Sequence, residues 1–337
     1  MQYKQLGSTG VMVSTLAYGT MPFGGAVDEA MAKTLYTRCR DAGINHFDCA
    51  DVYEGGRAEE VLGRLITGSR DELVITTKAY FPTGGDVNAR GASRYHLTRA
   101  LEASLRRLGT ERVDIFYLHR FDERVRLDET LRALEDFVRQ GKVLYLGASN
   151  FAAWQIARAL DVAEARGWTP FSCIQPMYNL GKRTAEIELL PMAAHEQLAV
   201  FPYGPLGGGL LSGKYGRARR PERGRLMENP MYQTRYADAR YYELAERFTA
   251  LARAHEVHPA TLAIAWVMSH PAVTAPLIGA RSQEQLEPLL AAAEFTLTPE
   301  LRASVSLLSP EPAPATDRNE EGSSHNYAAI TRGRASG

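Results

Sequence analysis

The sequence predicts an α/β protein built as one (β/α)8 TIM barrel. Eight short apolar segments alternate with longer segments of helical periodicity, and eight strand–helix units close such a barrel. The apolar segments lack polar alternation, as is typical of parallel strands covered on both faces. A single barrel commonly reaches the length of this 337-residue chain. We therefore expect one domain over residues 1–309 and a C-terminal tail over residues 310–337, flexible or docked over the active site.

A β-hairpin is expected before the first barrel strand. Residues 4–6 and 11–14 flank Gly7-Ser8-Thr9-Gly10, whose residue types favour a hairpin turn. This hairpin is expected to plug the bottom of the barrel.

The alternation places each element of the barrel. Strands are predicted at residues 16–19, 44–48, 73–78, 113–118, 143–147, 171–175, 198–202 and 274–278. Helices are predicted at residues 28–42, 57–67, 94–108, 128–140, 151–166, 184–196, 238–256, 259–269 and 282–293. Gly43, Gly109 and Gly141 follow three of these helices at the position where glycine commonly ends a helix. Long loops are expected after the third strand (80–93) and the seventh (204–237), where loops shape binding sites.

The composition excludes several classes of partner. Basic and acidic residues number 39 each, so we expect neither nucleic acid nor an anionic membrane as partner. No apolar run is long enough to cross a bilayer, and the N-terminus lacks the pattern of a signal peptide. Three widely spaced cysteines indicate neither a disulfide framework nor a metal site. A cytoplasmic location is expected.

Four reactive side chains lie at or just after the ends of predicted strands. Asp48 and Lys78 end the second and third strands, His119 follows the fourth, and Tyr53 comes five residues after Asp48. The carboxyl ends of barrel strands converge on one face, which carries the chemistry in essentially every known enzyme of this fold. Each residue alone has an ordinary explanation as a cap, a packing group or a solvated charge. Their coincidence at one end favours a site.

These residue types suit the transfer of a proton. A free tyrosine has a pKa of ~10, and a neighbouring ammonium such as that of Lys78 lowers it. Asp48 would hold the ammonium in place, while His119 would bind a substrate oxygen or assist Tyr53. The four side chains therefore predict a general acid with an oxyanion partner, suited to polarising a carbonyl.

The motifs around these residues resemble the aldo-keto reductase superfamily, in its bacterial and potassium-channel β-subunit-like branch. The resemblance covers roughly residues 3–308 and implies that Asp48, Tyr53, Lys78 and His119 are the catalytic tetrad, with Tyr53 as proton donor. The motifs that carry it are Phe47-Asp48-Cys49-Ala50-Asp51-Val52-Tyr53-Glu54, Gly56, Glu59, Leu62-Gly63, Thr77-Lys78, Tyr117-Leu118-His119-Arg120-Phe121-Asp122, Gly147-Ala148-Ser149-Asn150, Gln175-Pro176, Tyr203-Gly204-Pro205-Leu206 and Ile278-Gly279-Ala280-Arg281-Ser282.

The resemblance implies a nicotinamide dinucleotide, NADP(H) rather than NAD(H), bound without a Rossmann domain. The expected binding residues fall into four groups, for the ring, the carboxamide, the pyrophosphate and the adenosine phosphate. They are Gly19, Thr20, Met21 and Tyr203 with Gly204; Asp48, Ser149, Asn150 and Gln175; Leu206, Gly208, Leu210, Ser212 and Lys214; and Gly279, Ala280, Arg281, Ser282 and Gln285. The family often has Glu-Asn where this chain has Pro288-Leu289.

The leading hypothesis is reversible NAD(P)H-dependent reduction of an aldehyde or ketone. Residues expected to line the substrate site are Phe23, Tyr53, Tyr80, Phe81, His119 and Tyr232. Two alternatives stay open: a barrel lyase that forms a Schiff base on Lys78, and a redox-inactive or slow regulatory subunit that binds the cofactor. The partner would be a small carbonyl compound or alcohol, and a homo-oligomer is compatible with the sequence.

Overall fold

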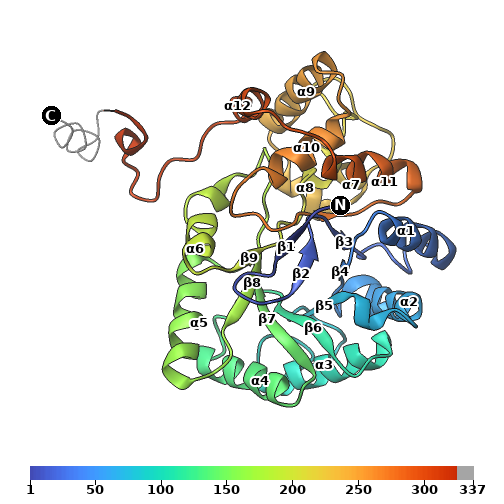
Figure 1. Ribbon diagram of the computed structural model, residues 1–337, viewed down its shortest axis with the longest axis vertical. Helices are drawn as coiled ribbons and strands as arrows, with labels where there is room; N and C mark the ends of the chain where they lie inside the picture. Colours follow the sequence, from blue (N-terminus) through green and yellow to red (C-terminus); the bar gives the residue numbers. More distant parts are fainter. Residues whose placement is uncertain (325–337) are drawn as a thin grey trace.

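A parallel eight-stranded barrel forms the centre of the protein (Figure 1). The computed structural model describes residues 1–324. The barrel strands are β3 (Ala17–Gly19), β4 (His46–Asp48), β5 (Val74–Ala79), β6 (Val113–Leu118), β7 (Val143–Ser149), β8 (Phe171–Gln175), β9 (Ala199–Val200) and β10 (Leu277–Ile278). They pair in chain order, and β10 returns to lie beside β3. The N–H groups of Thr274 and Leu277 donate to the carbonyls of Val200 and Pro202, each at 2.9 Å, and join the last two strands. The predicted (β/α)8 fold is confirmed.

The predicted hairpin plug is also confirmed. β1 (Tyr3–Gln5) and β2 (Met12–Ser14) pair in antiparallel fashion and lie across the barrel in the foreground of Figure 1. Leu6 and Val13 are fully buried and pack with Ile115 and Phe201 in the barrel interior. Their burial removes apolar surface from water at the end of the barrel opposite the carboxyl ends of the strands.

Helices surround the barrel on all sides (Figure 1). They are α1 (Glu29–Asp41), α2 (Arg57–Ile66), α3 (Arg94–Leu108), α4 (Leu127–Arg139), α5 (Ala153–Arg166), α6 (Leu189–His195), α9 (Ala239–Ala254), α10 (Pro259–Met268) and α11 (Gln283–Leu290). The helix predicted at residues 184–196 is instead a 3-10 turn followed by the shorter α6, which has Pro191 in its first turn. Proline lacks an N–H and is best tolerated in the first turn of a helix, which favours a start of α6 close before Pro191.

Three helices were not predicted. α7 (Arg225–Glu228) and α8 (Pro230–Arg235) lie within the long loop after β9, and α12 (Pro299–Ser306) follows the barrel. The loop has an apolar cluster of its own, formed by Leu210, Tyr215, Leu226, Tyr232 and Tyr236 with two residues of α9. Segments as short as α7 and α8 contain too few turns to show a helical period. Further 3-10 turns are η1 (Tyr53–Gly56), η2 (Arg70–Glu72), η3 (Thr184–Glu186), η4 (Gly207–Gly209), η5 (Ala291–Ala293) and η6 (Asn319–Gly322).

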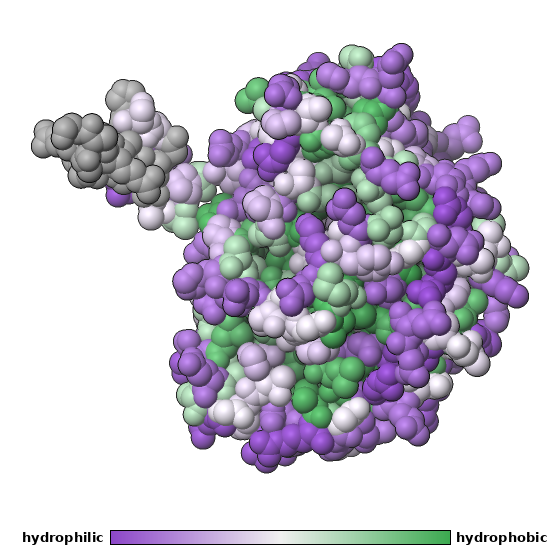
Figure 2. All heavy atoms as spheres, in the orientation of Figure 1, coloured by the Kyte–Doolittle hydropathy of each residue, from purple (hydrophilic) through white to green (hydrophobic). Residues whose placement is uncertain are grey.

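A contact with Arg183 holds the end of α12, just before the segment predicted as a tail. The Arg183 guanidinium donates to the carbonyls of Ser306 and Ser309, both at 3.3 Å, and fixes the end of α12. Residues 310–324 then run outward from the barrel (Figure 1); residues 325–337 of the predicted tail lie outside the described part of the chain. Hydrophilic side chains cover most of the hairpin face, with apolar patches between them (Figure 2). Within residues 1–324, no helix has the length and apolarity needed to cross a membrane.

Gly147 in β7 is required by the packing of the barrel interior. A Cβ at this position would lie 2.3 Å from Cε1 of Tyr117 and 2.9 Å from Sγ of Cys173, both buried. Because a close-packed interior cannot absorb such an overlap, we predict that Gly147→Ala lowers the free energy of unfolding by roughly 1–3 kcal/mol. Urea denaturation measures this. Gly84→Ala is the control, because no heavy atom lies within 4 Å of the added Cβ. A wild-type midpoint for Gly147→Ala would contradict the prediction.

Candidate active site

A buried ion pair lies at the carboxyl end of the barrel. Asp48 ends β4, and Lys78 is the penultimate residue of β5. Asp48 is paired in register with Thr76, so Lys78 lies two residues further along the same inward face. The Lys78 Nζ is 2.5 Å from the Asp48 Oδ2, and the two side chains are 0% and 3% exposed. The ammonium also donates to the backbone carbonyl of Cys49 at 2.7 Å.

The carboxylate of the pair is hydrogen-bonded on both oxygens. Gln175 at the end of β8 donates its Nε2 to the Asp48 Oδ1 at 2.9 Å. The Thr20 hydroxyl, just after β3, donates to the backbone carbonyl of Asp48 at 2.9 Å. The Gln175 bond helps to satisfy a charge that burial would otherwise make costly, while the Thr20 bond holds the backbone of Asp48.

Tyr53 lies beside the ammonium. Its hydroxyl oxygen is 3.5 Å from the Lys78 Nζ, and the Nζ lies 5.1 Å from the ring centroid. Glu54 and Gly55 adopt positive φ angles of 49° and 67°, so the chain turns sharply directly after the tyrosine. The predicted meeting of Asp48, Lys78 and Tyr53 is therefore present in the structure.

The protonation of Tyr53 differs from the prediction. Burial raises the pKa of Tyr53 well above its ordinary value, and the Asp48 carboxylate raises the pKa further. The sequence predicts a pKa lowered by Lys78, whereas burial is the largest influence here and acts in the opposite direction. Tyr53 thus carries its proton at neutral pH, which is the form that a proton donor needs.

His119 completes the group from the loop after β6. Its ring meets the ring of Tyr53 edge-on with centroids 6.0 Å apart, and the ring of Phe81 at 4.8 Å. Burial and the Lys78 charge lower the pKa of His119 well below its ordinary value, so the imidazole is neutral. Its buried Nδ1 has no hydrogen-bond partner among the described residues.

Four of the predicted cofactor residues form a hydrogen-bonded cluster next to the tetrad. The Ser149 hydroxyl donates to the Gln175 carbonyl at 2.9 Å. The Asn150 Nδ2 donates to the Ser149 Oγ at 3.1 Å and to the His119 carbonyl at 2.9 Å. The Tyr203 hydroxyl donates to the Asn150 Oδ1 at 2.7 Å. Amide and hydroxyl groups of these four residues are thus joined in one hydrogen-bond network that ends at the Tyr203 hydroxyl.

The glycine-rich stretch that begins the long loop after β9 packs against Tyr232, which lies later in the same loop. A Cβ on Gly208 would lie 2.6 Å from Cδ1 of Tyr232, so only glycine fits beneath this ring. Leu210 is fully buried, and the Ser212 hydroxyl donates to the Gly209 carbonyl at 2.6 Å. Lys214 is exposed.

The start of α11 carries three more of the predicted cofactor residues, Arg281, Ser282 and Gln285. Ser282 caps this helix by accepting from the Gln285 N–H at 3.4 Å, and the Gln285 Oε1 accepts from the Arg281 N–H at 3.1 Å. The Arg281 guanidinium lies 3.9 Å from the Glu228 carboxylate of α7. The segment after β10 is therefore in contact, through Arg281, with the long loop that carries α7. Four further predicted residues, Gly19, Met21, Gly279 and Ala280, lie at the ends of the neighbouring strands β3 and β10, and Gly204 follows Tyr203.

Of the predicted substrate residues outside the tetrad, two lie beside His119 and two are buried. Tyr80 and Phe81 are half-buried and meet edge to face at 5.3 Å, beside His119. Phe23 is fully buried against Tyr18, with centroids 5.8 Å apart, so its side chain belongs to the core and does not line an open site. Tyr232 is nearly buried and lies between the guanidinium groups of Arg225 and Arg235, 5.2 and 4.8 Å from its ring centroid.

Comparison with known proteins places this geometry in a family. Residues 15–306 match the Aldo/keto reductase family. The chain belongs to this family. It is 36% identical over 331 residues to the uncharacterized oxidoreductase YrpG of Bacillus subtilis, covering 94% of this chain and 98% of the relative. It is also 36% identical over 320 residues to a probable voltage-gated potassium channel subunit beta of rice (89% and 94% covered). Identity to versiconal hemiacetal acetate reductase of Aspergillus parasiticus is 31% over 332 residues (89% and 94% covered).

Membership of the aldo-keto reductases and the reductase relatives support an oxidoreductase that acts on carbonyl compounds. The sequence did not indicate every residue that builds the reductase site. The Cys49 carbonyl binds Lys78 through the backbone, which leaves no mark in side-chain chemistry. The Thr20 hydroxyl, which belongs to a residue predicted to line the nicotinamide ring, also holds the backbone carbonyl of Asp48. Among residues 1–324, no cluster of three His, Cys, Asp or Glu side chains is placed to bind a metal ion.

Removing one partner of the buried pair tests its energetics. We predict that Lys78→Met lowers the free energy of unfolding by about 3–5 kcal/mol, because the Asp48 charge stays buried without its cation. The double variant Lys78→Met/Asp48→Asn should recover most of the loss, because no unpaired charge remains. Chemical denaturation of the two variants and the wild type measures both effects. Equal stability of the single variant and the wild type would disprove the role given to the pair.

Proposed function

We propose that this aldo-keto reductase reduces an aldehyde or ketone to the alcohol with NADPH, reversibly, and that Tyr53 donates the proton. One observation carries the proposal: the Lys78 ammonium is buried between the Asp48 carboxylate, at 2.5 Å, and the Tyr53 hydroxyl, at 3.5 Å. Packing alone does not explain this arrangement, because burying an ammonium costs free energy. It suits a site where a neutral phenol becomes a phenolate.

The protein supplies the proton and stabilises the charge that its loss leaves behind. Tyr53 gives its proton to the carbonyl oxygen as negative charge develops there. The phenolate that remains is stabilised by the ammonium of Lys78, and this interaction is strong in a site with little water. Asp48 keeps the ammonium in place through the reaction. The neutral ring of His119 has one N–H, which would donate to the substrate oxygen and orient the carbonyl.

The residues present fit a nicotinamide dinucleotide. Ser149, Asn150 and Gln175 together offer the donors and acceptors that a carboxamide needs, and the Tyr203 ring offers a flat face for a heterocycle. When bound, the reduced nicotinamide supplies the hydride to the carbonyl carbon.

Arg281 favours the 2′-phosphorylated form of the cofactor. It lies directly before the capped N-terminus of α11, where the helix dipole favours an anion. Its contact with Glu228 is loose at 3.9 Å, so the guanidinium is free to bind a phosphate through two N–H groups.

The Schiff-base alternative conflicts with the contacts of Lys78. Its Nζ donates to the Asp48 carboxylate and the Cys49 carbonyl, so its lone pair carries a proton and does not attack a carbonyl. Trapping of substrate on Lys78 by borohydride would revive this alternative.

A regulatory role has one observation in its favour. The rice relative at 36% identity is named as a probable voltage-gated potassium channel subunit beta. This chain keeps all four tetrad residues, which supports turnover. Binding of NADPH without its oxidation across a broad carbonyl panel would favour the regulatory role.

Tyr53→Phe tests the proton donor. We predict a fall in kcat of at least about 100-fold, the lower range for loss of a general acid, with NADPH affinity unchanged because the hydroxyl is not needed to hold the cofactor. NADPH oxidation with a reactive aldehyde measures turnover, and cofactor fluorescence titration measures binding. Retention of wild-type turnover would disprove the mechanism.

Arg281→Met tests the cofactor preference. We predict that the KM for NADPH rises about 10- to 100-fold, as expected when a charged hydrogen bond is lost, while the KM for NADH changes little. Arg253→Met at the exposed end of α9 is the matched control. An equal effect of Arg281→Met on both cofactors would contradict the 2′-phosphate assignment.

A further inference from the structure

A second buried ion pair lies directly behind the catalytic lysine. Thr77 precedes Lys78 on β5, and its side chain points to the opposite face of the strand, toward α2. The Thr77 hydroxyl donates to the carboxylate of Glu59, which is completely buried. Arg107 of α3 completes the pair, with its Nε 2.7 Å and its Nη2 2.6 Å from the Glu59 Oε2. Three elements therefore converge on the outer face of β5, one residue from Lys78.

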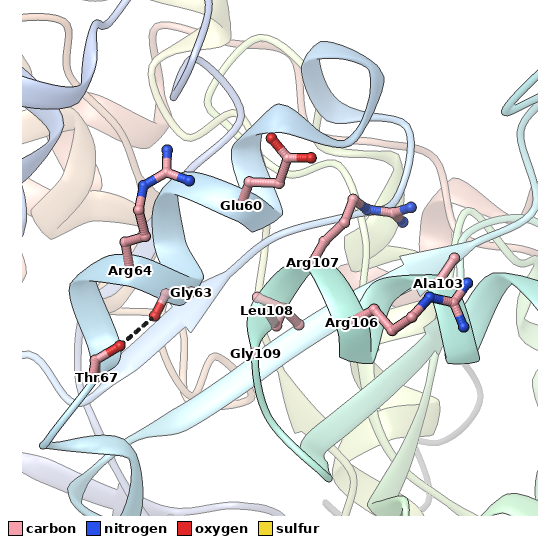
Figure 3. A pocket seen from close by; sticks show the side chains of 9 residues that line it. All are labelled: Glu60, Gly63, Arg64, Thr67, Ala103, Arg106, Arg107, Leu108 and Gly109. Carbon is pink, nitrogen blue, oxygen red and sulfur yellow. Dashed lines mark hydrogen bonds between the residues drawn. The ribbon is translucent and has the colours of Figure 1, made fainter.

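Two glycines allow Arg107 to reach this position. A Cβ on Gly56 would lie 2.8 Å from the Arg107 Cδ, and a Cβ on Gly63 would lie 2.6 Å from the Leu108 carbonyl oxygen. The bare backbone of this region therefore lets α3 approach α2 closely. Figure 3 shows Arg107 at the α2–α3 groove, a surface cavity also lined by Arg64 and other residues of the two helices.

Asp51 is the second carboxylate in this region. Its side chain is 2% exposed, and neither of its oxygens has a hydrogen-bond partner within the described residues. Its backbone N–H donates to the carbonyl of Lys78 at 3.1 Å, and Tyr53 follows two residues later. An ionised carboxylate in this position would be buried and unpaired, which is strongly unfavourable.

The charged groups around Asp51 come from three elements. Burial raises the pKa of Asp51 to about 8; Glu59 of α2 also raises it, while Arg107 of α3 and Lys78 of β5 lower it. The region thus contains two carboxylates, of which only Glu59 is paired with Arg107.

We propose that Asp51, Glu59, Thr77 and Arg107 form a positioning cluster that sets Lys78 against Tyr53, and that the cluster does so with Asp51 in its neutral form. Glu59 holds the strand at Thr77, while the Asp51 N–H holds the Lys78 carbonyl from the turn that carries Tyr53. When Asp51 ionises, it competes with Glu59 for Arg107, and the turn moves away from its position over Lys78. The inference rests on the proposed function, because its main readout is turnover.

The pH dependence follows from the direction of the shift. Asp51 releases its proton at about 3.8 in the unfolded chain and at about 8 in the folded protein. Between these values the native state binds more protons, so stability falls as pH rises, and it levels off above the folded value. In the wild type, kcat should fall as pH rises through the same upper value, because ionised Asp51 disturbs the cluster.

The experiment compares kcat and KM of the wild type, Asp51→Asn, Glu59→Gln and Asp114→Asn between about pH 6 and pH 9.5. This range spans the ionisation of a general acid–base system. Asp51→Asn keeps the shape of the side chain but cannot ionise, so the alkaline fall in kcat disappears while KM stays constant. Glu59→Gln keeps an acceptor for the Thr77 hydroxyl but removes the negative charge that opposes the ionisation of Asp51. The alkaline fall then moves to lower pH by about one unit or more.

Asp114→Asn is the matched control. The Asp114 carboxylate is nearly buried at the other end of β5, where it accepts from the Ile75 N–H at 2.7 Å and pairs with Arg70 at 2.8 Å. Its loss should reduce stability without moving the pH profile. In parallel, the unfolding free energy of Asp51→Asn should lack the decline with pH seen in the wild type.

The outcomes separate the two proposals. If the wild type turns over carbonyl compounds and Asp51→Asn keeps its alkaline fall, the positioning role is overturned and the proposed function stands. If Glu59→Gln shifts the profile no more than Asp114→Asn does, the role is likewise overturned. If none of the carbonyl compounds causes the wild type to oxidise NADPH, the proposed function fails and the positioning role fails with it.

Discussion

The ion pair between Lys78 and Asp48 is the interaction on which the rest of the structure depends. Burying an ammonium and a carboxylate costs several kcal/mol for each ion unless further hydrogen bonds offset it. Here Gln175 and the Cys49 carbonyl provide those bonds, and they come from chain segments more than a hundred residues apart. The closed barrel brings these segments together, so the pair depends on the fold.

The same pair sets the protonation of its neighbours. Burial and the Asp48 carboxylate both raise the pKa of Tyr53 and keep the phenol protonated. At His119, burial and the Lys78 charge both lower the pKa and keep the ring neutral. Under the proposed mechanism these groups are a neutral acid and a neutral hydrogen-bond donor, and the ammonium stabilises Tyr53 once it has given up its proton. That would be stabilisation of the reacting state and not of the resting one.

Much of this arrangement could be read from the sequence, and the remainder depends on contacts through space. Apolar strands ending in Asp48 and Lys78 indicated both the barrel and its catalytic face, since strand ends converge whatever the loops do. The folded loop with Tyr232 could not be predicted, because its cluster forms between turns too short to show a period. The raised pKa of Tyr53 and the unpaired carboxyl of Asp51 depend on burial by distant segments, which no local pattern records. Phe23 likewise carries an aromatic ring whose burial the sequence does not reveal.

Under the proposed function, the buried pair serves a proton transfer coupled to hydride transfer at a carbonyl carbon. Reduction of an aldehyde with NADPH deuterated at its hydride-donating carbon, in ordinary water, tests this claim most directly. Mass spectrometry of the alcohol should find the deuterium on the carbinol carbon, while the hydroxyl proton exchanges with water. An alcohol without deuterium at that carbon, or enzyme that consumes no labelled cofactor, would contradict the account.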